Sequence, residues 1–207
     1  MKVIYKLDEE NICLTWIGDT LQEFITSVEP SRVTYLDIAH NNLQTLPPEI
    51  GSLKILMHLR AYGNKLQTLP PEIGTLKNLT VLNVHDNELQ TLPPEIGSLK
   101  NLTHLDVSVN KLQTLPPEIG HLSSLTQLYV DNNNLQTLPP EICELRHLRK
   151  FYTSDNEFEY IPANVQNLIN RLRNVNARGP QYNDTQSVHK SSVQQSLKQS
   201  IYALMRD

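Results

Sequence analysis

A repeat of 23 residues runs through most of this chain and constrains its fold more than any other feature. The octapeptide Leu-Gln-Thr-Leu-Pro-Pro-Glu-Ile begins at Leu43, Leu66, Leu89, Leu112 and Leu135. Asparagine recurs with the same period at Asn41, Asn64, Asn87, Asn110, Asn133 and Asn156. No insertion interrupts the repeats, so chance does not account for the shared phase. A period of this length indicates a solenoid, in which each coil buries its apolar residues against the neighbouring coils.

Each repeat contains the signals of a strand followed by a short helical turn. An apolar pair such as Leu82 and Val84 precedes the repeated asparagine, with the alternation that is typical of a β-strand. Pro-Pro then ends sheet pairing, because proline has no N–H to donate. The Pro-Glu-Ile-Gly segment that follows is compatible with a helical turn, which tolerates proline at its first position. The asparagine amide is suited to satisfying backbone groups where the coil bends.

From Val33 to about Ile161 the chain resembles the leucine-rich repeat family, in its intracellular type with the pattern LxxLxLxxNxLxxLPxxIGxLxx. The resemblance implies an α/β solenoid, a curved horseshoe. A parallel β-sheet would line its concave side, short helical turns would lie on the convex side, and helical caps would cover the ends. It also implies a protein-binding role, as in similar proteins from plants, animal Ras-pathway scaffolds and host-associated bacteria.

The sequence around the repeats predicts four parts. Residues 1–32 are expected to form an N-terminal cap of strands plus a helix, and residues 33–161 the six leucine-rich repeats. Residues 162–176 have apolar side chains at helical spacing and predict a C-terminal cap helix. Residues 177–207 contain a Gly-Pro break and then an apolar stripe, which predicts a linker and an amphipathic tail helix.

Charge and cysteine content exclude several classes of partner. The net charge of −4 offers no basic face for nucleic acid, and no segment approaches the roughly 20 apolar residues that cross a bilayer. Neither a nucleic acid nor a membrane is therefore expected as a partner. Cys13 and Cys143 form no metal-binding motif, and the cysteine-rich caps common in extracellular relatives are absent. We therefore expect a cytoplasmic protein, or one delivered into the cytoplasm of a host cell.

The solvent-facing positions of the predicted strands form three columns across the concave side, because side chains alternate with a period of two. The first column is Tyr35, His58, Val81, His104, Gln127 and Lys150. The second is Asp37, Arg60, Asn83, Asp106, Tyr129 and Tyr152. The third is Ala39, Tyr62, His85, Ser108, Asp131 and Ser154.

These columns vary from coil to coil, whereas the octapeptide is repeated almost unchanged. A recognition surface needs different side chains in different coils, and tyrosine and arginine are frequent anchors of protein interfaces. The alternative is that nothing constrains these positions. The predicted partner-binding residues are Tyr35, Asp37, His58, Arg60, Tyr62, Asn83, His85, His104, Asp106, Gln127, Tyr129, Asp131, Lys150 and Tyr152.

The same columns argue against metal binding and catalysis. His58 and His104 are two strands apart, hence about 10 Å, which is too far for one zinc ion to bridge readily. His85, Ser108 and Asp131 are neighbours in the third column, but a hydrolytic triad needs the histidine in the middle. No glycine-rich phosphate-binding loop occurs. We therefore expect no enzyme activity, no metal and no cofactor.

Two functional hypotheses follow. In the first, the chain is a non-catalytic adaptor or effector that binds a protein partner on the concave face, with a monomer as the expected state and a dimer as the alternative. In the second, it is the recognition subunit of an enzyme system such as a ubiquitin ligase, and the tail helix recruits the catalytic protein. Replacing Leu197 and Ile201 with Asp would distinguish them, because only the second predicts loss of recruitment with concave binding intact.

Overall fold

The computed structural model describes residues 1–7 and 13–176 of the 207-residue chain. The compact unit that carries the repeats spans Met1–Asn174. The linker and tail helix predicted over residues 177–207 lie outside the described residues, as does the hypothesis that the tail recruits a catalytic protein.

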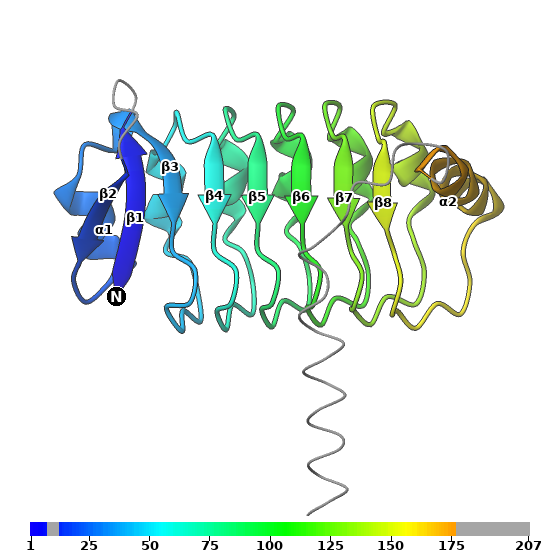
Figure 1. Cartoon of the computed structure of the whole chain (residues 1–207), viewed down its shortest axis with the longest axis horizontal. Helices are drawn as coiled ribbons and strands as arrows, with labels where there is room; N and C mark the ends of the chain where they lie inside the picture. The colour runs from blue at the N-terminus through cyan, green and yellow to red at the C-terminus, as the bar shows by residue number, and fades with distance from the viewer. Residues whose placement is uncertain (8–12, 177–207) are drawn as a thin grey trace, which may run out of the picture. The chain divides into compact units, whose positions relative to one another are not determined.

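The described residues form a sheet of eight strands in the order β2-β1-β3-β4-β5-β6-β7-β8 (Figure 1). The strands are β1 Lys2–Leu7, β2 Leu14–Ile17, β3 Val33–Asp37, β4 His58–Arg60, β5 Val81–Asn83, β6 His104–Asp106, β7 Gln127–Tyr129 and β8 Lys150–Tyr152. The strands β3 to β8 pair in parallel, which confirms the predicted sheet. The strand β1 pairs antiparallel with both β2 and β3, so the N-terminal hairpin extends this sheet by two strands.

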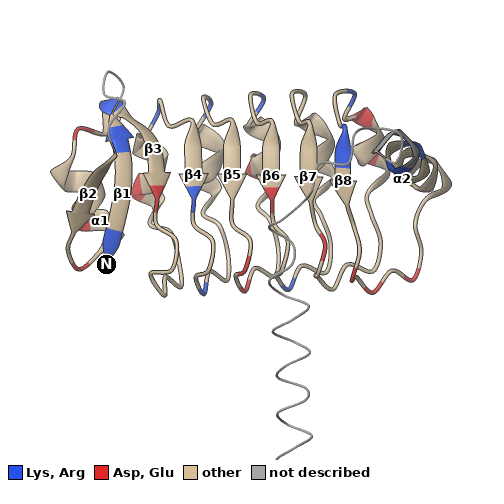
Figure 2. Cartoon of the chain, viewed as in Figure 1, with Lys and Arg blue, Asp and Glu red and all other residues tan. Residues whose placement is uncertain are grey.

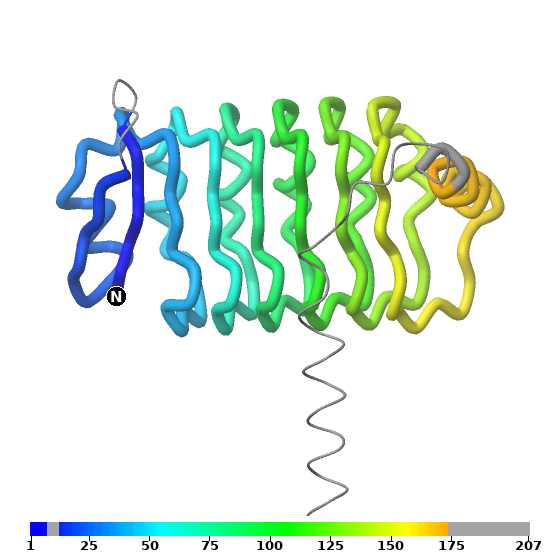
Figure 3. Tube along the Cα trace, viewed as in Figure 1, coloured from blue at the N-terminus to red at the C-terminus, as the bar shows by residue number. Residues whose placement is uncertain are grey.

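Short 3-10 helices lie behind the sheet (Figure 3) and confirm the predicted helical turns. They are η2 Pro48–Ser52, η3 Pro71–Thr75, η4 Pro94–Ser98, η5 Pro117–His121 and η6 Pro140–Glu144. Each begins at the second proline of Pro-Pro, where the missing N–H would have had no partner within the helix.

Helices also lie at both ends of the repeats. At the N-terminal end, η1 (Pro30–Arg32) follows α1 (Leu21–Ser27), which begins with a capping box between Thr20 and Glu23. At the other end, α2 (Ala163–Asn176) buries an apolar face of Val165, Leu168, Ile169 and Leu172. Buried residues from Val3 to Leu172 form one continuous core, consistent with coils stabilised by their neighbours.

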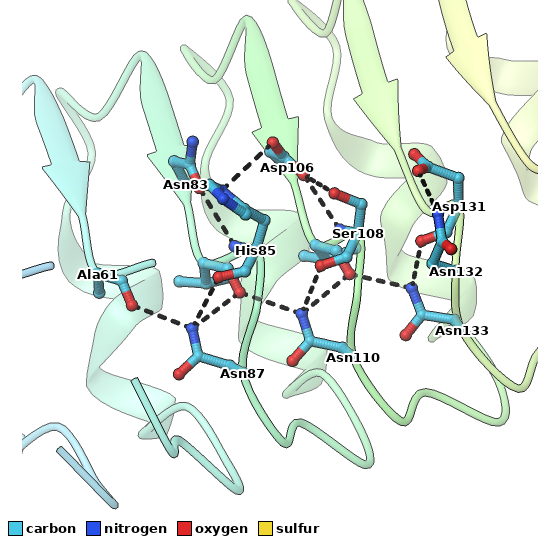
Figure 4. Close-up of polar contacts among 12 residues, drawn as sticks. Ala61, Asn83, His85, Asn87, Asp106, Ser108, Asn110, Asp131, Asn132 and Asn133 are labelled. Atoms are coloured by element: carbon cyan, nitrogen blue, oxygen red, sulfur yellow. Dashed lines mark hydrogen bonds and ion pairs between the residues drawn. The ribbon is translucent and has the colours of Figure 1, made fainter. Parts of the chain in front are cut away.

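A ladder of asparagines joins successive coils, and we call it the asparagine ladder: Asn64, Asn87, Asn110 and Asn133, which are buried, and Asn156, which is partly buried. The Asn110 amide donates to the carbonyl oxygens of Val84, Val107 and Ser108 at 3.0–3.1 Å (Figure 4). Its side-chain oxygen accepts from the N–H of Leu89 at 2.9 Å. One side chain therefore satisfies four buried backbone groups at the bend that ends each strand.

The residue before each repeated asparagine has a left-handed backbone. This position is occupied by His40, Gly63, Asp86, Val109, Asn132 and Asp155, with φ between 53° and 64°. Glycine, asparagine, aspartate and histidine tolerate this conformation, but a β-branched residue does so rarely. Val109, with φ 53°, is therefore strained where its counterparts are not.

Replacing Val109 with Asn is expected to raise the free energy of unfolding by about 1 kcal/mol, because Asn adopts the left-handed region more readily than Val. Urea denaturation followed by circular dichroism measures the change. The reciprocal variant Asn132→Val should be destabilised by at least as much. Equal midpoints for Val109→Asn and the unmodified chain would show that the strain is relieved in some other way.

Candidate functional site

The predicted columns are in register on the solvent-facing side of the sheet, which we call the concave face. In the first column, Tyr35 pairs with His58, His58 with Val81, and Val81 with His104. The second column follows the same pairing from Asp37 to Tyr152. In the third column, the carbonyl of each member accepts from a backbone N–H of the preceding coil. The donor is the left-handed residue that follows the preceding member, as in Gly63 N–H to His85 O at 3.1 Å. The coil geometry therefore brings the candidate residues onto one surface.

The concave face is wider than the repeats alone predict, because β1 and β2 continue its columns. Lys6 pairs with Tyr35 and Ile4 with Asp37, while Thr15 of β2 pairs with Ile4. The sequence predicts only a capping role for this hairpin. The sequence signal for the wider face was the alternation of β1, in which Val3 is fully buried and the residues beside it face outwards.

A group of cations surrounds Tyr35 near the N-terminal end of the concave face. Lys6 Nζ lies 5.8 Å and Arg60 Cζ 5.7 Å from the centre of the Tyr35 ring. Tyr35 donates from its hydroxyl to Asp37 Oδ2 at 3.2 Å. Burial raises the pKa of Tyr35, and the Asp37 carboxylate acts in the same direction. Burial lowers the pKa of His58, as do Arg60 and Lys6, so this imidazole is predominantly uncharged at neutral pH.

At the centre of the face, Asp106 lies between a histidine and a serine (Figure 4). Ser108 Oγ donates to Asp106 Oδ1 at 2.6 Å, and His85 Nδ1 is 3.8 Å from Asp106 Oδ2. His85 Nδ1 also forms a 2.7 Å hydrogen bond with Asn83 Oδ1. In a hydrolytic triad the histidine contacts both the nucleophile and the carboxylate. Here the carboxylate holds the middle position, so the arrangement fixes side chains and does not activate Ser108.

Asp131 is a partly buried carboxylate of the predicted site. Burial raises its pKa, and the neighbouring carboxylates of Asp106 and Asp155 add to the effect. The Asn132 amide donates to Asp131 Oδ2 at 2.9 Å and partly opposes this shift. A half-buried carboxylate near others of like charge is a group that a cationic or hydrogen-bond-donating ligand would stabilise.

Two pairs of stacked rings lie on the concave face. Tyr62 and His85 stack with centroids 4.8 Å apart and planes 7° apart, and Tyr129 and Tyr152 stack at 4.8 Å and 8°. Neighbouring strands are about 4.8 Å apart, so equivalent positions hold rings at stacking distance. Tyr152 is 39% exposed. Rigid aromatic surfaces of this kind are typical anchors of protein interfaces.

The remaining predicted residues lie at the first positions of their strands. Gln127 accepts from the Tyr129 hydroxyl at 2.8 Å, and His104 Nδ1 is 2.8 Å from Thr103 Oγ1. Burial lowers the pKa of His104, with a smaller contribution from Lys150, which is exposed. Within the described part of the chain, no three His, Cys, Asp or Glu residues are placed to hold a metal ion. None of the described helices has the length and apolar character needed to span a membrane.

Comparison with known proteins identifies the family. Residues 31–110 match the model of a leucine-rich repeat region, and residues 100–142 match a model of two leucine-rich repeats. The ectodomain of the receptor kinase SOBIR1 from Arabidopsis thaliana is 34% identical over 64% of this chain and 75% of that one, with a TM-score of 0.57. The chain belongs to the leucine-rich repeat family. Domains of this family are generally protein–protein interaction modules and are typically non-catalytic.

Other leucine-rich repeat structures match a smaller share of their own length. The ectodomain of the plant membrane receptor kinase GASSHO1/SCHENGEN3 from Arabidopsis thaliana, in complex with CASPARIAN STRIP INTEGRITY FACTOR 2, is 33% identical. The match covers 62% of this chain and 17% of that one, with a TM-score of 0.57. A leucine-rich repeat protein of Leptospira interrogans is 32% identical over 65% of this chain and 46% of that one, with a TM-score of 0.40. A search of curated proteins found no match.

Proposed function

We propose that this chain is a non-catalytic adaptor or effector that binds a protein partner across its concave face. The observation that carries the proposal is the contrast between the two sides of each coil. The octapeptide is repeated almost unchanged, whereas the concave face presents four tyrosines, two of them stacked on each other. A scaffold requires only the repeated part, and a varied aromatic surface is what a specific interface requires.

The size of the face supports the same function. Eight strands about 4.8 Å apart span about 34 Å, which can accommodate a standard interface of roughly 800 Å² per partner. The GASSHO1/SCHENGEN3 ectodomain was solved in complex with CASPARIAN STRIP INTEGRITY FACTOR 2, so a related solenoid binds a separate partner. We propose that the partner of this chain is likewise a protein, bound by a monomer.

We also propose that the chain works in a cytoplasm, its own or that of a host cell. Cys13 and Cys143 are both free and exposed, as expected for a reducing compartment.

A pull-down from host-type cell lysate tests the concave face. The chain is compared with a variant carrying Tyr62→Ala, Tyr129→Ala and Tyr152→Ala, which should lose a protein that the unmodified chain retains. The matched control carries Gln67→Ala, Gln90→Ala and Gln113→Ala, three exposed octapeptide positions, and should retain it. Circular dichroism verifies that all three are folded. Retention of the same proteins by the tyrosine variant would exclude the concave face as the binding site.

A further inference from the structure

A groove of about 590 Å³ runs along the edge of the sheet where the repeat strands begin. It extends from Thr34 to Ser124, and its wall includes Ile55, Met57 and Thr80. All the residues that line it are uncharged. With neighbouring strands about 4.8 Å apart, the groove is about 19 Å long, which matches about six residues of an extended peptide.

Two apolar residues interrupt a hydrogen-bond ladder at this edge. Thr80 Oγ1 donates to the Met57 carbonyl, and Asn78 Nδ2 to the Lys54 carbonyl, both at 2.9 Å. Thr103 and Asn101 repeat these two bonds one coil further on, also at 2.9 Å. The equivalent positions of the preceding coil hold Met57 and Ile55, whose side chains cannot donate.

The stability of the solenoid does not explain these two residues. Each of these hydrogen bonds adds to the stability of the solenoid, and the side chains of Ile55 and Met57 make neither of them. Met57 is in addition 43% exposed, which leaves an apolar side chain in water. Met57 and Ile55 line the groove together, and an apolar patch with a polar rim is typical of an interaction site.

The charges beside the groove indicate what kind of segment it fits. Exposed lysines immediately precede Ile55, Asn78 and Asn101 in the sequence, at Lys54, Lys77 and Lys100. Figure 2 shows cationic residues at the turns that lead into β4, β5 and β6. No acidic side chain lines the groove. The surface is therefore apolar at Ile55 and Met57, with lysines in the turns beside it. Lys77 and Lys100 also donate to the backbone carbonyls of Ser98 and His121. Such a surface complements an aliphatic side chain with acidic neighbours.

The groove is continuous with the concave face. Met57, Thr80 and Thr103 immediately precede three members of the first column in the sequence. A protein lying on that column is therefore adjacent to the groove.

We propose that the groove receives an aliphatic side chain, next to acidic residues, from the protein that the concave face binds. This inference rests on the proposed function and adds a second contact region outside the three columns. The aliphatic side chain packs against Met57 and Ile55, and the acidic neighbours lie toward Lys54 and Lys77.

The test uses a phage-displayed random peptide library selected on the full chain. Affinities of the selected peptides are then measured by fluorescence anisotropy. The key variant carries Ile55→Asn and Met57→Thr, the residue types that donate these hydrogen bonds in the following coils. It should leave the thermal unfolding midpoint unchanged or higher. Peptides with an aliphatic residue beside Asp or Glu should bind it about tenfold more weakly or worse, as expected when one aliphatic side chain is no longer buried. Met57→Ala, which adds no polar group, should weaken binding in the same direction.

The outcomes separate this inference from the proposed function. In one outcome, the selected peptides lose affinity for the Tyr62, Tyr129 and Tyr152 variant but bind the Ile55→Asn/Met57→Thr variant as tightly as the unmodified chain. That result would contradict the proposed role of the groove and would still support binding by the concave face. Peptides that lose affinity for both variants support both proposals. Failure to select any peptide would count against both. Replacing the acidic residues of a selected peptide with their amides should reduce its affinity, and an unchanged affinity would contradict the role of the lysines.

Discussion

Replacing Asn110 with Ala is expected to lower the free energy of unfolding by about 3–5 kcal/mol. The change removes the donor for three carbonyl oxygens and the acceptor for the Leu89 N–H. Asn110 is only 8% exposed, so water does not easily replace these bonds, and each unsatisfied buried group costs about 1–3 kcal/mol. Because coils are stabilised by their neighbours, damage at a central coil also weakens the coils on either side.

Urea denaturation followed by circular dichroism measures this loss. The matched control is Asn101→Ala, which removes one exposed hydrogen bond to the Lys77 carbonyl and should cost about 1 kcal/mol or less. A second variant, Asn110→Asp, keeps an acceptor for Leu89 but places a carboxylate among three carbonyl oxygens, and should be no more stable than Asn110→Ala. Similar losses for Asn110→Ala and Asn101→Ala would show that the asparagine ladder is not a main source of stability.

Replacing Gly97 with Val is expected to destabilise the chain by about 3 kcal/mol or more. A Cβ atom at Gly97 would lie 2.5 Å from the backbone oxygen of Glu118 and 2.8 Å from its Cβ. Both atoms belong to the next coil, and a backbone atom cannot move aside as a flexible side chain can. The coils must therefore separate locally, and overpacking of this kind costs about 1–3 kcal/mol even where side chains can adjust.

The fifth coil supplies the control for this variant. Cys143 occupies the position equivalent to Gly97, and Asn164 replaces the glutamate of the following coil. Cys143 borders a pocket of about 260 Å³ that Asn164, Leu168 and Arg171 also line, so there is room for a side chain. Cys143→Val should therefore change the unfolding midpoint little. If Gly97→Val were as stable as Cys143→Val, close stacking of the coils would not be the reason for glycine.

Much of the fold could be predicted from the sequence because the chain is built from a regular repeat. Leu82 and Val84 are separated by one residue, and a strand with a period of two must then bury both and expose the position between them. Because the same spacing recurs every 23 residues, the columns of the concave face followed without any knowledge of the tertiary structure. The Pro-Pro pair likewise placed each helical turn within one or two residues of its observed start.

The N-terminal hairpin was predicted only in part. Its alternation indicated strands, but nothing in residues 1–17 specifies that β1 pairs antiparallel with β3. That pairing depends on the edge that the first repeat strand leaves open and on the core around Phe24, which contacts Tyr5 and Trp16 edge to face at 5.0 and 5.7 Å. The wider concave face is therefore a result of tertiary packing.

The coil, its buried leucines and the order of side chains along each column follow from the periodicity of the sequence, because these features are local. The contacts between coils depend instead on tertiary packing. Tyr62 stacks on His85, and His85 Nδ1 lies 3.8 Å from Asp106 Oδ2, although these partners come from different repeats. A spacing of about 4.8 Å between strands permits several arrangements of such side chains. Packing and hydrogen bonding select among them, and so they also define the surface that we propose binds the partner.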